Sequence, residues 1–151
     1  MTSWNDFAAA EPDFSRRVLE IFETQKHMTL ATLRRDGSPR ISGTEAHVVD
    51  GQLVLGMMAG SLKARDLIRD PRLALHSPTF DPPEDDPSAW IGDAKITGLA
   101  VEHIDRDPED ESYEFFVDIT EVVLTKVGNP PDHLAIESWH PDRGLRVQRR
   151  E

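Results

Sequence analysis

The sequence contains no cysteine. Disulfides, thiolate catalysis, cysteine-ligated zinc and iron–sulfur clusters are therefore excluded. No apolar run reaches the length of about 18 residues that a membrane-spanning helix needs. The segment from Met1 to Ala10 lacks the basic start and the apolar centre of a signal peptide. We therefore expect a single globular domain of residues 1–151, located in the cytoplasm and without a membrane partner.

Basic residues are few relative to acidic ones. The chain has 17 Lys and Arg against 28 Asp and Glu, which gives a formal net charge of −11. The excess is local, because the segment from Asp81 to Glu121 holds 14 acidic and 2 basic residues, whereas residues 1–80 hold ten of each. Binding to a nucleic-acid backbone needs a basic patch, so no nucleic-acid partner is expected. The composition does not exclude a local anion-binding site within the neutral segment of residues 1–80.

The common catalytic and metal-binding motifs are also missing. The six histidines are scattered singly, and no two of them have the spacing of a metal motif. There is no Gly-x-Ser-x-Gly, no P-loop and no Gly-x-Gly-x-x-Gly. We therefore expect no metal site, no serine hydrolase and no Rossmann-type nucleotide fold. The sequence identifies no catalytic acid or base.

Two tight turns organise the segment 36–77. Asp36-Gly37 and Asp50-Gly51 each lie between alternating apolar runs, which is the strongest short-range signal for a β-hairpin. The second hairpin leads into a short helix from Ser61 to Arg69, with Ser61 as a suitable N-cap and Asp70-Pro71 as a stop.

The rest of the pattern predicts a mainly β chain. A broad apolar stripe predicts a helix from Glu11 to Lys26. The acidic stretch from Pro108 to Phe116 is predicted to be a short helix with Asp107 as its cap. In the strand expected from Ile91 to Asp105, Gly98 indicates a bulge or a close backbone approach. Many short strands with few helices are typical of a small barrel. The other strands are predicted at Met28–Leu33, Arg40–Val49, Gln52–Met57, Arg72–His76, Val117–Val127, Leu134–Trp139 and Leu145–Gln148.

Residues 78–90 form an acidic, proline-rich stretch. Four prolines and four acidic residues lie between Pro78 and Pro87, and such a segment continues neither a helix nor a strand. We expect a solvated loop within the domain, and we favour a plain surface insertion over a lid.

The best candidate for a binding site is the start of the predicted helix. Ser61 and Lys63 lie beside backbone N–H groups without helical partners, and a phosphate needs such donors together with a cation. A capping serine and a solvated lysine are the alternative. Strand alternation places Arg40, Ser42 and Thr44 on one face, across from this turn. Arg40 is equally well explained as an edge arginine.

Two further side chains are candidates for contact with a flat ring, and each also has a simpler explanation as a packing residue. Met57 is polarisable enough to line a flat ring system, although core packing is the more common role of methionine. Trp139, beside His140, is a candidate for covering the edge of a ring, but we favour an anchor in the core or at an interface.

An ordered set of these features resembles the pyridoxamine 5′-phosphate oxidase-like split barrels. The set comprises Gly37-x-Pro39, the Asp50-Gly51 turn and Ser61-x-Lys63-x-x-x-Leu67-x-x-Asp70-Pro71-Arg72. The resemblance extends from about Met28 to Ala100. It implies a split β-barrel of Greek-key type with a few short helices, paired into a homodimer.

The resemblance also implies a function. Its members bind FMN or the deazaflavin coenzyme F-420 in the groove between subunits, and we expect an oxidoreductase that transfers hydride to or from a small molecule. Ser61 and Lys63 fall at the positions where members of the family bind the phosphate. Arg40 and Ser42 fall on the strand from which members of the family bind both the phosphate and the ring. The backbone around Thr32 resembles the strand along the cofactor ring. A non-enzymatic flavin- or haem-binding protein on the same fold is the alternative.

Overall fold

The Asp50-Gly51 turn joins β2 (Pro39–Val49) to β3 (Gln52–Met58) in the computed structural model, which describes residues 1–103, 109 and 111–151. Asp50 and Gly51 have φ angles of 50° and 77°, and a two-residue hairpin turn with the correct twist requires positive φ at both positions. The earlier turn contains Gly37 at φ 84° and joins β1 (Met28–Leu33) to β2. Both predicted hairpins are confirmed.

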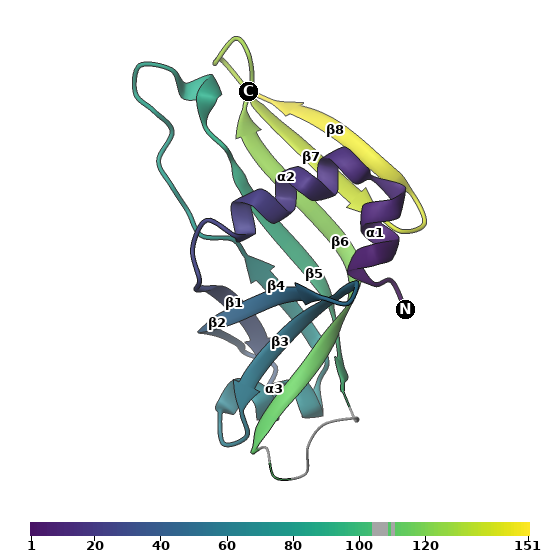
Figure 1. The fold of residues 1–151 in the computed structure, drawn as a ribbon. Coiled ribbons are helices and arrows are strands. Elements are labelled where there is room, and N and C mark those ends of the chain that lie inside the picture. The colour runs from purple at the N-terminus through teal and green to yellow at the C-terminus, as the bar shows by residue number, and fades with distance from the viewer. Residues whose placement is uncertain (104–108, 110) are drawn as a thin grey trace.

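Strands β1 to β6 close into a barrel (Figure 1). The sheet runs in the order β3-β2-β1-β4-β5-β6-β7-β8, and a further pairing between β3 and β6 closes the ring. The barrel is completed by β4 (Arg72–His76), β5 (Asp93–Glu102) and β6 (Ser112–Val127). Beyond it, β7 (Leu134–His140) and β8 (Gly144–Arg150) extend the sheet from the far end of β6. The mainly β barrel is therefore confirmed.

Strand β6 belongs to both parts of the sheet. Its first residues pair with β3, its middle pairs with β5, and its last residues pair with β7. The helix predicted over this region is wrong for Ser112–Phe116, while Asp107 and Pro108 lie outside the described residues. The reason is tertiary: Phe115 and Val117 are fully buried on the inner face, and pairing with two neighbouring strands outweighs local propensity.

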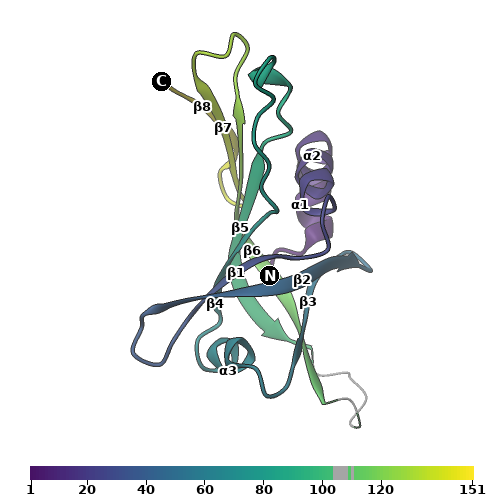
Figure 2. The same ribbon diagram turned by 90° about the vertical axis from the view of Figure 1, so that its left-hand side faces the viewer.

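Two helices cover one face of the extended sheet. Figure 2 shows α1 (Trp4–Ala10) and α2 (Pro12–Phe22) on one side of the upright sheet formed by β5 to β8, while the opposite side carries no helix in the described part of the chain. Phe7 is at the centre of the contact, with its ring centroid 5.2 Å from Trp4, 5.8 Å from Phe14 and 4.8 Å from Trp139. Aromatic pairs at these distances add to the stability that burial gives. Trp139 is thus a core anchor.

A partly buried ion pair fixes α2 to the sheet. Arg17 donates from both terminal nitrogens to the two carboxylate oxygens of Glu137 on β7, at 2.7 and 2.6 Å. Glu137 is only 8 % exposed, and its charge is compensated by this bidentate contact.

The structure differs from the sequence prediction mainly at the helices. The predicted helix ends at Phe22 rather than Lys26, and α1 was not predicted although Ser3 and Asp6 form a capping box at its start. None of the helices in the described residues has the length and apolar character needed to cross a bilayer. Between Pro78 and Trp90 the chain is irregular apart from a short 3-10 turn, η1 (Pro87–Ala89).

Candidate functional site

The first turn of α3 (Leu62–Arg69) lies at the lower end of the barrel in Figure 1. Ser61 is the N-cap, and its Oγ accepts a hydrogen bond from the backbone N–H of Ala64 at 3.3 Å. The helix begins here because Ser61 has an extended backbone, with φ −70° and ψ 145°, and satisfies one of the N–H groups that lack helical partners. The cap predicted from the sequence is confirmed.

Lys63 links this turn to the neighbouring strand. Its Nζ donates to the carbonyl oxygen of Gly43 on β2 at 2.7 Å. The ammonium group therefore lies over the middle of β2, between the positions of Ser42 and Thr44. Ser42 is half-buried, whereas Thr44 is 3 % exposed and points into the barrel. The Lys63 ammonium group and Ser42 are thus close to each other in the fold, because Ser42 precedes Gly43.

Asp66 is the centre of a buried polar cluster that was not predicted. Its carboxylate accepts hydrogen bonds from Thr32 Oγ1 at 2.7 Å, from Arg40 Nε at 2.6 Å and from Arg69 Nη2 at 2.9 Å. Arg69 also donates to the carbonyl of Leu33 at 2.8 Å. The cluster joins β1, β2 and α3, so it sets the position of α3 against the first hairpin.

The electrostatics of the cluster favour a charged Asp66. Burial alone would raise the pKa of this carboxyl, but the hydrogen bonds from Arg40, Thr32 and Arg69 outweigh burial and lower the pKa below the usual aspartate value. Arg40 is consequently held by Asp66, and Thr32 directs its hydroxyl to the same carboxylate. The predicted residues Thr32 and Arg40 therefore both donate hydrogen bonds to the Asp66 carboxylate. One feature of the sequence could have indicated the Asp66 cluster: Asp66 lies next to the apolar positions Ala64 and Leu67 on the buried face of α3.

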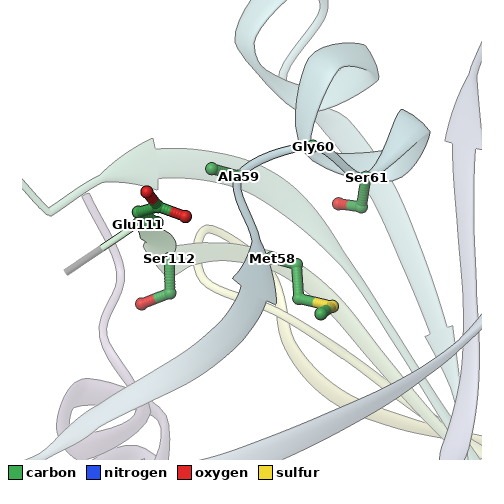
Figure 3. A pocket seen from close by; sticks show the side chains of 6 residues that line it. All are labelled: Met58, Ala59, Gly60, Ser61, Glu111 and Ser112. Carbon is green, nitrogen blue, oxygen red and sulfur yellow. The ribbon is translucent and has the colours of Figure 1, made fainter.

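A cavity of about 540 Å³ opens beside the α3 cap. Figure 3 shows its lining, in which the turn between β3 and α3 faces the start of β6. Met58 is 76 % exposed here, whereas Met57 is 6 % exposed and belongs to the core. Of the two adjacent methionines, Met58 is therefore the one whose side chain lines this cavity. The lining residues are Met58, Ala59, Gly60, Ser61, Glu111 and Ser112.

The outer face of the barrel carries a second open cavity, of about 380 Å³. Ala31 on β1, Ile41 on β2 and Ala74 on β4 line it with short or apolar side chains. Ile41 is 75 % exposed, which is unusual for a large aliphatic side chain. His76 and Glu121 lie at the same cavity.

The histidines do not gather. Among the residues that the structure describes, no group of three or more His, Cys, Asp or Glu side chains is arranged to hold a metal ion. His140 lies between Glu121, 2.8 Å from its Nε2, and Arg143, which contacts its Nδ1.

The family profile of pyridoxamine 5′-phosphate oxidase matches residues 14–143, which is most of the chain. The chain belongs to the pyridoxamine 5′-phosphate oxidase family. The curated proteins include no sequence with significant similarity to it.

Several solved structures share the fold. A pyridoxamine 5′-phosphate oxidase-related, FMN-binding protein from Nostoc punctiforme is 9 % identical, with a TM-score of 0.65 over 93 % of this chain and 96 % of that one. A haem-binding protein from Mycobacterium smegmatis is 15 % identical, with a TM-score of 0.52 over 89 % and 85 % of the two chains. An F-420 reductase is 18 % identical, with a TM-score of 0.50 over 68 % and 93 %. At such identities the likeness shows the fold alone, and the predicted split barrel is confirmed.

Proposed function

We propose that this protein is an oxidoreductase that binds FMN or coenzyme F-420 and transfers hydride to or from a small-molecule substrate. The observation that carries the proposal is the α3 cap, where Ser61 lines an open cavity and Lys63, two residues further on, extends its ammonium group to the carbonyl of Gly43 on β2. The family to which the chain belongs, and FMN- and F-420-related proteins with the same fold, support it.

The donors at this turn fit a phosphate. The backbone N–H groups of the first helical turn lack helical partners, Ser61 offers a hydroxyl, and Lys63 offers a charge. Ser42 adds a second hydroxyl from β2. We assign Ser61 and Lys63 to direct phosphate binding and Ser42 to its edge. Arg40 contributes its charge while held by Asp66.

The side chains of the other predicted residues lie inside the protein. The side chains of Thr32, Thr44 and Met57 are all buried within the chain. The backbone around Thr32, however, lines a shallow outer groove of about 190 Å³ between β1 and β4, and we propose that the flat ring of the cofactor lies along this strand. Thr44 and Met57 belong to the interior of the barrel.

Hydride chemistry is supplied by the bound cofactor, and the protein binds, orients and shields. Lys63 and the capped helix hold the phosphate end, which fixes the position of the ring relative to β1. Correct positioning of reactants is itself a large part of catalysis. No acid or base is assigned to the reaction.

We further propose that the active form is a homodimer. The outer face of the barrel carries exposed aliphatic side chains at Ile41 on β2 and at Leu99 and Val101 on β5. Exposed aliphatic side chains that share one face are typical of an interface, and a second copy is the simplest cover. Sedimentation at micromolar concentration should give twice the chain mass of 17.0 kDa. A species at the chain mass would contradict the dimer.

A specific observation supports a second candidate, a haem-binding protein without enzymatic activity. His76 lies at the outer cavity, and its Nδ1 is 2.8 Å from the carbonyl of Ser77. If Nδ1 donates its hydrogen there, Nε2 is the unprotonated nitrogen that binds iron.

The absorption spectrum of freshly purified protein decides between the candidates. A flavin or deazaflavin band supports the oxidoreductase. A Soret band that disappears in His76→Ala supports the haem-binding protein and overturns the oxidoreductase proposal.

A further inference from the structure

A small cavity lies between the two N-terminal helices and the barrel, and we call it the helix–barrel cavity. Its volume is about 120 Å³, and it lies where α2 passes above β2 (Figures 1 and 2). The helices are fixed to the β2–β3 hairpin nearby, since the backbone N–H of Asn5 donates to the carbonyl of Gly51 at 2.9 Å. The α3 cap is at the other end of the barrel. The apolar lining comes from both helices and three strands: Trp4, Leu19, Phe22, Ala46, Leu53 and Ile96.

The walls of the cavity suit an apolar ligand of limited size. Trp4, Phe22 and Ile96 are buried members of the core, so the walls are held in place by the packing around them. An apolar cavity of about 150 Å³ is large enough to bind benzene. The helix–barrel cavity therefore has room for a body of about one ring. The mouth of a β-barrel is also a common place for a small-molecule site.

The mouth of the cavity favours a positive charge. Glu23 lines it, is exposed, and makes no side-chain hydrogen bond or ion pair within the part of the chain that the structure describes. The nearby cations Lys26 and His27 lie instead at Glu45 on β2, at 3.6 and 3.3 Å. The last turn of α2, which ends at Phe22, contains no basic residue. The negative end of the helix dipole therefore adds to the charge of Glu23.

We propose that the helix–barrel cavity binds a small organic amine. The apolar body of the amine, about one ring in size, lies between Trp4 and Phe22, and its ammonium group meets the Glu23 carboxylate at the mouth. His47 lines the same mouth and in its neutral form offers a second hydrogen-bond acceptor. A neutral molecule of the same shape lacks the attraction to Glu23, and a small cation without a ring leaves the walls uncovered. The site lies apart from the α3 cap and does not depend on the proposed function.

Calorimetric titration of the full chain at low salt compares benzylamine, benzyl alcohol and methylamine. Benzylamine should bind saturably, benzyl alcohol on the order of tenfold more weakly, and methylamine not measurably up to about 10 mM.

Two variants locate the site. Ala46→Leu fills the cavity and should lower the affinity for benzylamine at least roughly tenfold, without loss of stability in urea. Glu23→Gln should reduce the affinity for benzylamine to that of benzyl alcohol, while the affinity for benzyl alcohol changes less than about twofold. The matched control, Glu20→Gln, removes an exposed carboxylate of the same helix that does not line the cavity, and it should change neither affinity.

Three results would overturn the amine site: no saturable binding of benzylamine up to about 10 mM, equal affinities for benzylamine and benzyl alcohol, or wild-type affinity in Ala46→Leu. If Ala46→Leu does not fold, Glu23→Gln decides alone, because an exposed carboxylate is replaced without a change of volume, and an unchanged affinity for benzylamine refutes the site. Lys63→Ala, at the other end of the barrel, should leave benzylamine binding unchanged. Failure of the cofactor proposal is therefore distinguishable from failure of this one.

Discussion

Replacing Lys63 with alanine should weaken cofactor binding far more than it weakens folding. In the protein alone, the Lys63 ammonium group makes one hydrogen bond, to the carbonyl of Gly43, at an exposed position. Its loss should cost at most about 1 kcal/mol of unfolding free energy, and alanine returns part of this as a better helix former. With a phosphate bound, the same ammonium group makes a charge-assisted contact worth about 1.5–3 kcal/mol, which corresponds to roughly a tenfold to hundredfold loss of affinity.

Fluorescence titration and urea denaturation measure the two effects separately. The matched control is Arg16→Ala on α2, which also removes an exposed helical cation but at the opposite end of the molecule (Figure 1). It should leave cofactor affinity unchanged. Wild-type affinity in Lys63→Ala would place the phosphate elsewhere and refute the reasoning. Unfolding of the variant would show that Lys63 is a structural residue.

Three further predictions concern the fold. Glu137→Ala leaves Arg17 only its 3.2 Å contact with the exposed Asp13 and should lower the unfolding free energy by on the order of 2–3 kcal/mol in urea, against less than about 0.5 kcal/mol for Arg16→Ala, whose ion pairs are exposed. Asp66 has a lowered pKa in the folded state, so its charged carboxylate stabilises the folded protein. This stabilisation is complete above the pKa of an aspartate in the unfolded chain, about 4, and is lost as the pH falls through the lower pKa of the folded state. The stability gap between wild type and Asp66→Asn should therefore shrink in acid, and a gap independent of pH would contradict the cluster. Gly98→Ala brings a Cβ into steric overlap with the backbone carbonyl oxygen of Asp118 on β6 and should cost on the order of 2 kcal/mol. Gly56→Ala, with open space around it, should cost less, and equal losses would refute the close approach.

The strands were predictable because their signals are local. Alternation and the two Asp-Gly turns placed β1 to β4 within one or two residues, and Gly98 correctly indicated an irregularity, since the register of β5 against β6 shifts between Thr97 and Gly98. The start of β6 was not predictable in this way. Its acidic residues favour exposure, and only its partners β3 and β5 show that Phe115 is inside the barrel.

The candidate site was predictable only in part. The cap at Ser61 and the nearby cation at Lys63 follow from residue type and spacing. The Asp66 cluster does not, because Thr32 and Asp66 are 34 positions apart in sequence, and no local pattern in β1 or α3 indicates that the two elements meet. Strand alternation likewise puts Met57 and Met58 on two different faces of β3, but it does not say which face is buried until the barrel is closed.

Titration of the ligand-free protein with FMN, riboflavin and coenzyme F-420 tests the central claim most directly, because riboflavin is FMN without its phosphate. The proposed site at Ser61 and Lys63 predicts saturable binding of FMN or F-420, and binding of riboflavin at least roughly tenfold weaker than that of FMN if FMN is the cofactor. F-420 binding should in turn fall by a similar factor in Lys63→Ala. Failure to bind either cofactor, or riboflavin affinity equal to that of FMN in a protein that binds FMN, would contradict the account.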